Sequence, residues 1–245
     1  MAKYYQRLCG LVRKAITEYG LIHDGDRVAV GVSGGKDSVI LTLALADLKK
    51  YIGVDFDVVG VTVDPRFYSK TTDYSPIARL FESRGIEYHT EITDIGPVVF
   101  DIRKEDSPCS LCSRMRRGAL LKAARQYGCN RLALGHHFDD AIETFYMNLW
   151  NEGRIGTFSP DIFMEDNGMH VIRPMCLATE NEVVRAVKET GAPIIKSVCP
   201  QDGRTNRREL KEFISQKCRT DSHFREKHLN AFQKSGIDGW APKRK

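Results

Sequence analysis

Short apolar runs alternate with helical segments along most of this chain, and that alternation limits the folds open to it. Residues 28–32 form an apolar run typical of a strand buried on both faces, and residues 56–63, 86–92, 131–134 and 170–174 are further predicted strands. The predicted helices cover residues 4–20, 37–50, 75–83, 110–127, 139–150, 181–190, 205–218 and 222–235. This order predicts an α/β fold, an open, mainly parallel five-stranded sheet with helices on both faces.

No internal repeat or low-complexity linker divides the 245 residues. We therefore predict one domain over residues 1–245, with a helical extension over 1–24 and a second over 200–245. The composition, 42% apolar and 28% charged, is that of a globular protein. No run approaches the ~20 consecutive apolar residues of a membrane span, and the first residues lack the apolar region of a signal peptide. We expect a cytoplasmic protein with no membrane partner.

A glycine-rich loop follows the first predicted strand, as Ser33-Gly34-Gly35-Lys36-Asp37-Ser38. A helix that begins at the carboxyl end of a parallel strand presents unpaired N–H groups to anions, and the two glycines let the backbone approach a ligand. The two serine hydroxyls and Lys36 add donors and a positive charge. A Walker A loop is excluded, because Val30 and Asp37 stand where it needs glycine and Ser or Thr. The loop predicts a phosphate site.

A second polar turn follows the fourth predicted strand, as Gly135-His136-His137-Phe138-Asp139-Asp140. Two carboxylates at a helix start suit a magnesium ion that bridges phosphates. Asp139 could equally be the helix N-cap, and we favour Asp140 as the functional residue. Asp64 ends the second predicted strand, where adenosine would lie, although such aspartates are often turn residues.

Seven cysteines, an odd number, argue against a disulfide framework. Cys109 and Cys112 have metal-ligand spacing and directly precede a basic helix. Closed zinc or iron–sulfur sites usually take four ligands, so this pair must recruit others. Cys199 is the first choice for a third ligand, with Cys176 and Cys218 left as alternatives. Burial as small apolar residues is predicted for Cys9, Cys129, Cys176 and Cys218.

Four motifs together resemble the tRNA 2-thiocytidine synthetase branch of the PP-loop ATP pyrophosphatases: residues 33–38, 108–118, 135–140 and 172–174. The resemblance spans about residues 5 to 240. It implies adenylation, with ATP and Mg²⁺, of the C2 oxygen of a cytidine in the tRNA anticodon loop, at position 32. Sulfur delivered through a 4Fe-4S cluster then replaces that oxygen.

The same resemblance implies a role for individual residues. Cys109, Cys112 and Cys199 would hold the cluster and leave one iron without a protein ligand. Better-known members carry a second C-x-x-C at the later site and a longer tail, whereas Cys199-Pro200-Gln201-Asp202 has one thiol. Lys36 and Asp140 would support adenylation. The three cysteines would support sulfur transfer. The implied nucleotide contacts are Ser33, Gly34, Gly35, Lys36, Asp37, Ser38, Asp64, Arg114, Gly135 and Asp140.

Basic residues are clustered, although the net charge is only +5. Arginine forks suit phosphates, so Arg116 and Arg117 are candidates to face tRNA beside Arg114. Arg117 could equally be a solvent-exposed residue of the helix that contacts no tRNA. The C-terminal extension, residues 200–245, is the predicted tRNA-contacting part. Its basic residues are Arg204, Arg207, Arg208, Lys211, Lys243, Arg244 and Lys245.

Other functions stay open at this stage. A 2-thiouridine-forming tRNA thiolase of the same fold is one alternative. The sulfur donor, a cysteine desulfurase or sulfide, is also open, as is a homodimer. A tRNA-lysidine-type ligase or an amidotransferase-like synthetase also adenylates, but it attacks with an amine and has no use for Cys109. A zinc-stabilised RNA-binding scaffold would contain one zinc ion and turn over no ATP.

Overall fold

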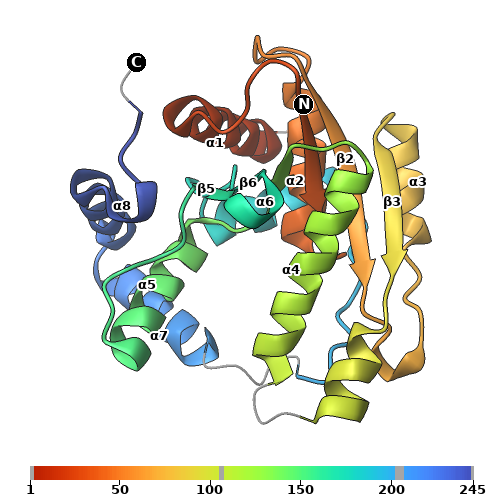
Figure 1. Ribbon diagram of the computed structural model, residues 1–245. Helices are drawn as coiled ribbons and strands as arrows, with labels where there is room; N and C mark the ends of the chain where they lie inside the picture. Colours follow the sequence, from red (N-terminus) through yellow and green to blue (C-terminus); the bar gives the residue numbers. More distant parts are fainter. Residues whose placement is uncertain (1–2, 105–107, 202–206, 244–245) are drawn as a thin grey trace.

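The computed structural model describes residues 3–104, 108–201 and 207–243, and within them six strands form one sheet. The strand order is β3-β2-β1-β4-β6-β5 (Figure 1). All neighbouring pairs are parallel except β5 with β6, which is antiparallel. The strands are β1 (Asp26–Gly31), β2 (Phe56–Asp64), β3 (Glu87–Ile92), β4 (Arg131–Ala133), β5 (Asp161–Met164) and β6 (Met169–Ile172).

Helices connect the parallel strands and form both ends of the described chain. The α-helices are α1 (Lys3–Tyr19), α2 (Lys36–Leu48), α3 (Ser75–Ser83), α4 (Pro108–Gln126), α5 (Phe138–Glu152), α6 (Glu180–Thr190), α7 (Arg207–Thr220) and α8 (Phe224–Ser235). Short helical turns of other types cover Phe67–Ser69, Pro97–Arg103, Glu165–Asn167 and Ile237–Gly239.

The sheet has one hydrophobic layer on each face, because successive side chains of a strand point to opposite sides. In β1, Val28 and Val30 pack into the cluster that contains α1, α2 and α6, whereas Ala29 packs with α4 on the other face. Figure 1 shows α4 lying across the near face of the sheet, and α4 contacts both β2 and β4. Each buried aliphatic side chain in these layers contributes about 1.5–3 kcal/mol.

Both ends of the described chain pack into this same core. Leu8, Val12 and Ile16 of α1 are buried, and α1 packs against α6 and α2. Near the other end Trp240 is completely buried, and its indole N–H donates to the Phe158 carbonyl at 2.7 Å. Residues before β1 and after α8 are therefore part of the structural core that supports the sheet.

The predicted α/β sheet with helices on both faces is confirmed, with one strand more than the five predicted. The additional strand, β5, has only four residues and no period-two pattern of apolar residues that would single it out. None of the described helices has the length and apolar character needed to cross a membrane.

Candidate functional site

The loop of residues 33–38 connects β1 to the start of α2, as predicted. Gly34 has φ +85°, a conformation that favours glycine, and Gly35 is the N-cap without a side-chain cap. The Ser38 hydroxyl accepts from the Ser33 N–H at 3.0 Å and donates to the Gly35 carbonyl at 3.1 Å. The loop is thus held in shape by the Ser38 side chain, and no side chain caps the start of α2, so its first N–H groups could bind an anion.

Lys36 is engaged by carboxylates within this loop region. Its ammonium lies 2.9 Å from Asp37 and 3.2 Å from Glu180, and Lys211 also contacts Glu180 at 3.2 Å. Burial alone would lower the pKa of Lys36, but these two carboxylates raise it. Burial would raise the pKa of Glu180, but Lys211 and Lys36 outweigh it and hold the pKa below 4.5. The Lys36–Glu180 pair is therefore lost as pH falls through the lowered pKa of Glu180, and at the alkaline end as pH rises through the raised pKa of Lys36.

Gly135, after β4, lies directly against the loop. A Cβ at this position would lie 3.0 Å from the Asp37 carbonyl carbon and 3.1 Å from the Ser38 nitrogen. His137 is the N-cap of α5 and forms a capping box with Asp140, whose carboxylate accepts from the His137 N–H at 2.9 Å. The two polar turns predicted from sequence are therefore in contact.

Asp139 is not the N-cap, contrary to one of its two predicted roles. It is buried, and one carboxylate oxygen accepts from the Arg225 guanidinium at 2.7 Å while the other accepts from the Glu180 N–H at 2.7 Å. The pairing with Asp139 outweighs burial and raises the pKa of Arg225. Asp139 thus connects α5 to α6 and α8 in this structure.

Asp64 has the turn role that was its predicted alternative. It is buried, and its two carboxylate oxygens accept from the backbone N–H groups of Arg66 at 2.9 Å and Thr72 at 2.8 Å. The carboxylate therefore fixes the segment that follows β2. That segment forms one wall of the cavity beside the loop.

A cavity of about 240 Å³ opens beside the glycine loop. It joins the loop to Cys199 and to Arg116 of α4, three features far apart in the sequence. Arg116 lines it in place of Arg114, which is exposed. The other apolar and polar groups that line the cavity suit an aromatic base with a sugar. The full lining is Ser33, Gly35, Pro65, Phe67, Thr72, Tyr74, Arg116, Ile195, Lys196, Ser197, Val198 and Cys199.

The segment that carries Cys199 is attached to the glycine loop. The Ile195 N–H donates to the Gly34 carbonyl at 2.9 Å, and a Cβ at Gly34 would lie 3.1 Å from the Ile195 Cβ. Gly34 is therefore needed both for its positive φ and for this close approach. The attachment fixes where Cys199 enters the cavity.

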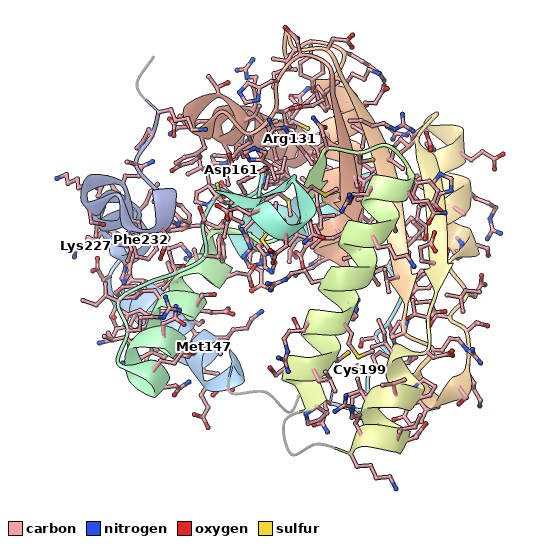
Figure 2. The ribbon with its side chains drawn as sticks, in the orientation of Figure 1. Arg131, Met147, Asp161, Cys199, Lys227 and Phe232 are labelled. Carbon is pink, nitrogen blue, oxygen red and sulfur yellow. The ribbon has the colours of Figure 1, made fainter. Side chains whose placement is uncertain are left out.

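Cys199 lies beside the two cysteines of α4. Figure 2 shows it next to the lower, N-terminal half of α4, and it packs with Cys112 in an apolar cluster that includes Phe67 and Val99. Cys109 is exposed one helical turn before Cys112. Burial raises the pKa of Cys112, Arg116 opposes this, and the charges of Cys199 and Cys109 add to it. Both other thiols therefore act on Cys112.

The other cysteines lie apart from this group. Cys9, Cys129 and Cys176 are buried as predicted, and Cys218 is half-buried near Arg225. Burial raises the pKa of Cys129 to about 11. Among the described residues no three His, Cys, Asp or Glu side chains converge as ligands of one metal ion. A polynuclear cluster differs, because its cysteine ligands bind different iron atoms.

Several predicted basic residues lie outside the described part: Arg204, Arg244, Lys245 and the side chains of Arg207 and Arg208. Lys243 contacts Asp161 at 3.9 Å. Sequence reasoning missed Tyr74, Glu180 and the position of Arg116 in the cavity. Only Arg116 carried a usable signal, since it follows Cys112 by four residues and so shares its helix face.

Comparisons with known proteins show the family of this chain. Residues 7–218 match the model of the PP-loop domain family. A tRNA-cytidine(32) 2-sulfurtransferase from Pelobacter propionicus is 36% identical, covering 93% of this chain and 85% of that protein. One from Syntrophotalea carbinolica is 37% identical, covering 94% and 89%. The U34-tRNA thiolase NcsA from Methanococcus maripaludis, solved with its 4Fe-4S cluster, shares the fold, with TM-score 0.76, 22% identity and coverage of 95% and 78%. The chain therefore belongs to the PP-loop family and, within it, to the tRNA-cytidine(32) 2-sulfurtransferases.

Proposed function

We propose that this protein uses ATP to activate the C2 oxygen of a cytidine, at position 32 of a tRNA, and replaces that oxygen with sulfur. The observation that carries the proposal is the cavity shared by the glycine loop and Cys199. An activated base formed at the loop would lie next to the thiol group. Proximity of this kind turns two reactions into steps within one site.

ATP would bind with its phosphates on the glycine loop and its adenosine in the cavity beside Tyr74. The N–H groups at the start of α2 and the Lys36 ammonium would stabilise the phosphates. Asp140 is the proposed carboxylate for Mg²⁺, because both oxygens of Asp139 are bound by protein groups. Asp64 would act indirectly, by holding the cavity wall that follows β2.

The proposed reaction balances without an oxidant or reductant. The C2 oxygen of cytidine attacks the α-phosphorus of ATP, the bond to the β-phosphate bridging oxygen breaks, and pyrophosphate leaves. Hydrosulfide then adds at C2, and the oxygen departs with AMP. The products are 2-thiocytidine, AMP and pyrophosphate. Lys36 would stabilise negative charge on the departing phosphates.

The three cysteines fit a 4Fe-4S cluster. Cys112 and Cys199 share an apolar pocket, Cys109 is within electrostatic reach, and Arg116 adds positive charge that favours thiolates. A cluster bound by three cysteines supplies one iron with an open position for hydrosulfide. The residues Cys109, Cys112 and Cys199 would hold the group, and the surrounding apolar side chains would keep water away from it.

The tRNA would approach over α4 and the basic residues of the segment 200–245. We propose a cytoplasmic protein that receives sulfide, directly or from a cysteine desulfurase, and that acts as a monomer or a homodimer. Exposed Arg114 and Arg117 on α4 offer forks for phosphate contacts.

The decisive experiment is thiolation of unmodified tRNA by anaerobically purified protein with ATP, Mg²⁺ and sulfide. Nucleoside mass spectrometry is expected to show 2-thiocytidine that depends on ATP. Formation of 2-thiouridine alone would overturn the choice of base in favour of the uridine thiolase alternative. ATP-dependent tRNA modification that survives replacement of Cys109, with an amine and no sulfur in the product, would favour a ligase-type reaction. A bound zinc ion without ATP turnover would favour the RNA-binding scaffold.

Glu180 is expected to compete with ATP for Lys36. The Glu180→Gln variant removes the carboxylate that contacts Lys36 at 3.2 Å, so ATP should bind about two- to five-fold more tightly, the range of a partly exposed ion pair. Isothermal titration with a non-hydrolysable ATP analogue measures this. Glu152→Gln, which changes an exposed carboxylate paired with Arg154, is the matched control. If the ATP analogue binds Glu180→Gln as tightly as the parent or more weakly, the phosphates do not displace Glu180 from Lys36.

A further inference from the structure

Arg173 follows β6 at the carboxyl edge of the sheet and is half-buried without a counter-ion. Its Nε is inaccessible to solvent and has no hydrogen-bond acceptor. Among the described residues no carboxylate lies within ion-pair distance of it. Two other buried or half-buried arginines do have one, since Arg131 pairs with Asp26 and Arg225 with Asp139. A half-buried charge without a counter-ion is costly, so an anion would stabilise Arg173.

The guanidinium of Arg173 is held in one orientation by neighbouring backbone and ring atoms. Its Nη1 donates to the Ser159 carbonyl at 2.5 Å, and its carbon lies 4.9 Å from the centre of the Phe158 ring. The Arg173 N–H also donates to the Pro160 carbonyl at 2.9 Å. Phe158 is itself anchored by the indole of Trp240. The side chain is therefore positioned in advance for a ligand.

Arg117 belongs to the part of α4 that covers the same edge of the sheet, because Leu120, about one turn further along α4, lies 3.3 Å from where a Cβ at Gly31 would be, at the end of β1. Burial and the charge of Arg117 lower the pKa of Arg173 to about 10, although Cys176 opposes them. Arg117 is exposed and has no ion-pair partner within the described part of the chain. An anion bound between Arg117 and Arg173 would be stabilised by both positive charges. Arginine forks bind phosphate bidentately.

Arg117 and Arg173 lie at the carboxyl edge of the sheet, outside the glycine loop that would bind the nucleotide. β6 is the neighbour of β4, and Gly135 at the end of β4 contacts the glycine loop after β1. Arg117 is on the same helix as Cys112, about one and a half turns further along. An anion held by the pair would thus lie along the edge where the base must enter. The ATP phosphates already have the loop and Lys36.

We propose that Arg117 and Arg173 together bind one phosphate of the RNA backbone and thereby position the target nucleotide between the glycine loop and the cysteines. This inference rests on the proposed function and extends it, by assigning two residues to substrate positioning. The group that the two arginines would bind is a phosphate, and ATP or pyrophosphate could supply one as well as the RNA backbone. The exposure of Arg117 favours the RNA backbone, because that ligand arrives from outside.

The test compares Arg117→Gln and Arg173→Met with Lys122→Gln, which removes one exposed charge further along α4. Binding of unmodified tRNA is measured by filter binding over a salt series, ATP binding by titration, and thermal unfolding by calorimetry. For Arg117→Gln we expect tRNA binding about ten-fold weaker, a salt slope smaller by about one, unchanged ATP affinity and an unfolding temperature that does not fall. Lys122→Gln should bind tRNA as the parent does.

The outcomes separate the alternatives. Weaker ATP binding with unchanged tRNA binding would assign the phosphate to the nucleotide and overturn the RNA assignment. An unfolding temperature that falls in Arg117→Gln with unchanged binding of both ligands would make the pair structural. If Arg173→Met fails to fold, the result for Arg117→Gln still distinguishes these alternatives. Failure of the parent protein to bind any tRNA would contradict the proposed function itself, independently of these variants.

Discussion

Replacing Cys199 with serine is expected to abolish tRNA thiolation while ATP binding persists. Serine is nearly the same size as cysteine, so the cavity that Cys199 shares with Ser33 and Gly35 keeps its shape. What the variant loses is the proposed thiolate ligand. Since even groups that only support metal ligands contribute about 10–100-fold to metal affinity or activity, loss of a ligand should cost at least ~100-fold.

Three measurements on the same anaerobic preparation make this result specific. Iron and acid-labile sulfide content, with the visible absorbance, report the cluster. Titration with an ATP analogue reports the nucleotide site, and nucleoside mass spectrometry reports 2-thiocytidine. We expect Cys199→Ser to lower both the cluster content and the yield of 2-thiocytidine. Binding of the ATP analogue should be unchanged.

Cys218→Ser is the matched control, because Cys218 is half-buried near Arg225 and outside the group of three. It should keep both the cluster and thiolation. The opposite pattern, with Cys199→Ser active and Cys218→Ser inactive, would move the third ligand to Cys218 and would contradict the proposed site. A Cys199→Ser protein that no longer binds ATP would instead show that Cys199 supports the nucleotide cavity.

The local motifs of this site could be predicted from sequence because each is contained in one strand–loop–helix unit. The loop 33–38 and the turn 135–140 lie where the carboxyl ends of parallel strands must place them. The choice of Cys199 over Cys176 was left open by spacing alone. The structure places Cys199 against α4 and Cys176 in the core, and that difference depends on the course of residues 191–199.

Other features depend on contacts between distant segments, which no local pattern contains. Glu180 reaches Lys36 across 144 positions, and Tyr74 enters the cavity from the segment after β2. Asp139 looked like a cap or a metal ligand because aspartate commonly begins a helix. The N-cap is His137, a residue type that seldom has this role, so the aspartates are displaced from their expected positions. β5 was not predicted because it has only four residues and no alternating pattern of apolar residues.

Adding a single methyl group at Gly135 is expected to lower the rate of adenylation several-fold, because the loop must shift by a few tenths of an ångström and a shift of about 1 Å can cost about 100-fold. The backbone of Gly135 does not need a positive φ, so alanine is sterically permitted by its own conformation. Its Cβ would, however, lie 3.0 Å from the Asp37 carbonyl carbon and 3.1 Å from the Ser38 nitrogen. Those are backbone atoms at the start of α2, so the glycine loop itself must shift.

Two further glycines separate this effect from general overpacking. Gly60→Ala would bring a Cβ within 3.0 Å of the Tyr88 ring and 3.2 Å of the Phe81 ring, inside the sheet and away from the loop. Both clashing variants should lose about 1–3 kcal/mol of stability. Gly10→Ala meets no atom within 4 Å and should be neutral or stabilising in α1.

Release of pyrophosphate in the presence of tRNA, measured beside thermal unfolding, therefore distinguishes the two effects. Gly135→Ala and Gly60→Ala should unfold at similarly reduced temperatures, yet only Gly135→Ala should show the several-fold slower adenylation. Equal losses of activity in both would mean that stability, not loop position, governs the rate. Full activity in Gly135→Ala would mean that the loop tolerates displacement, and the contact between the two polar turns would then have no part in placing the phosphates.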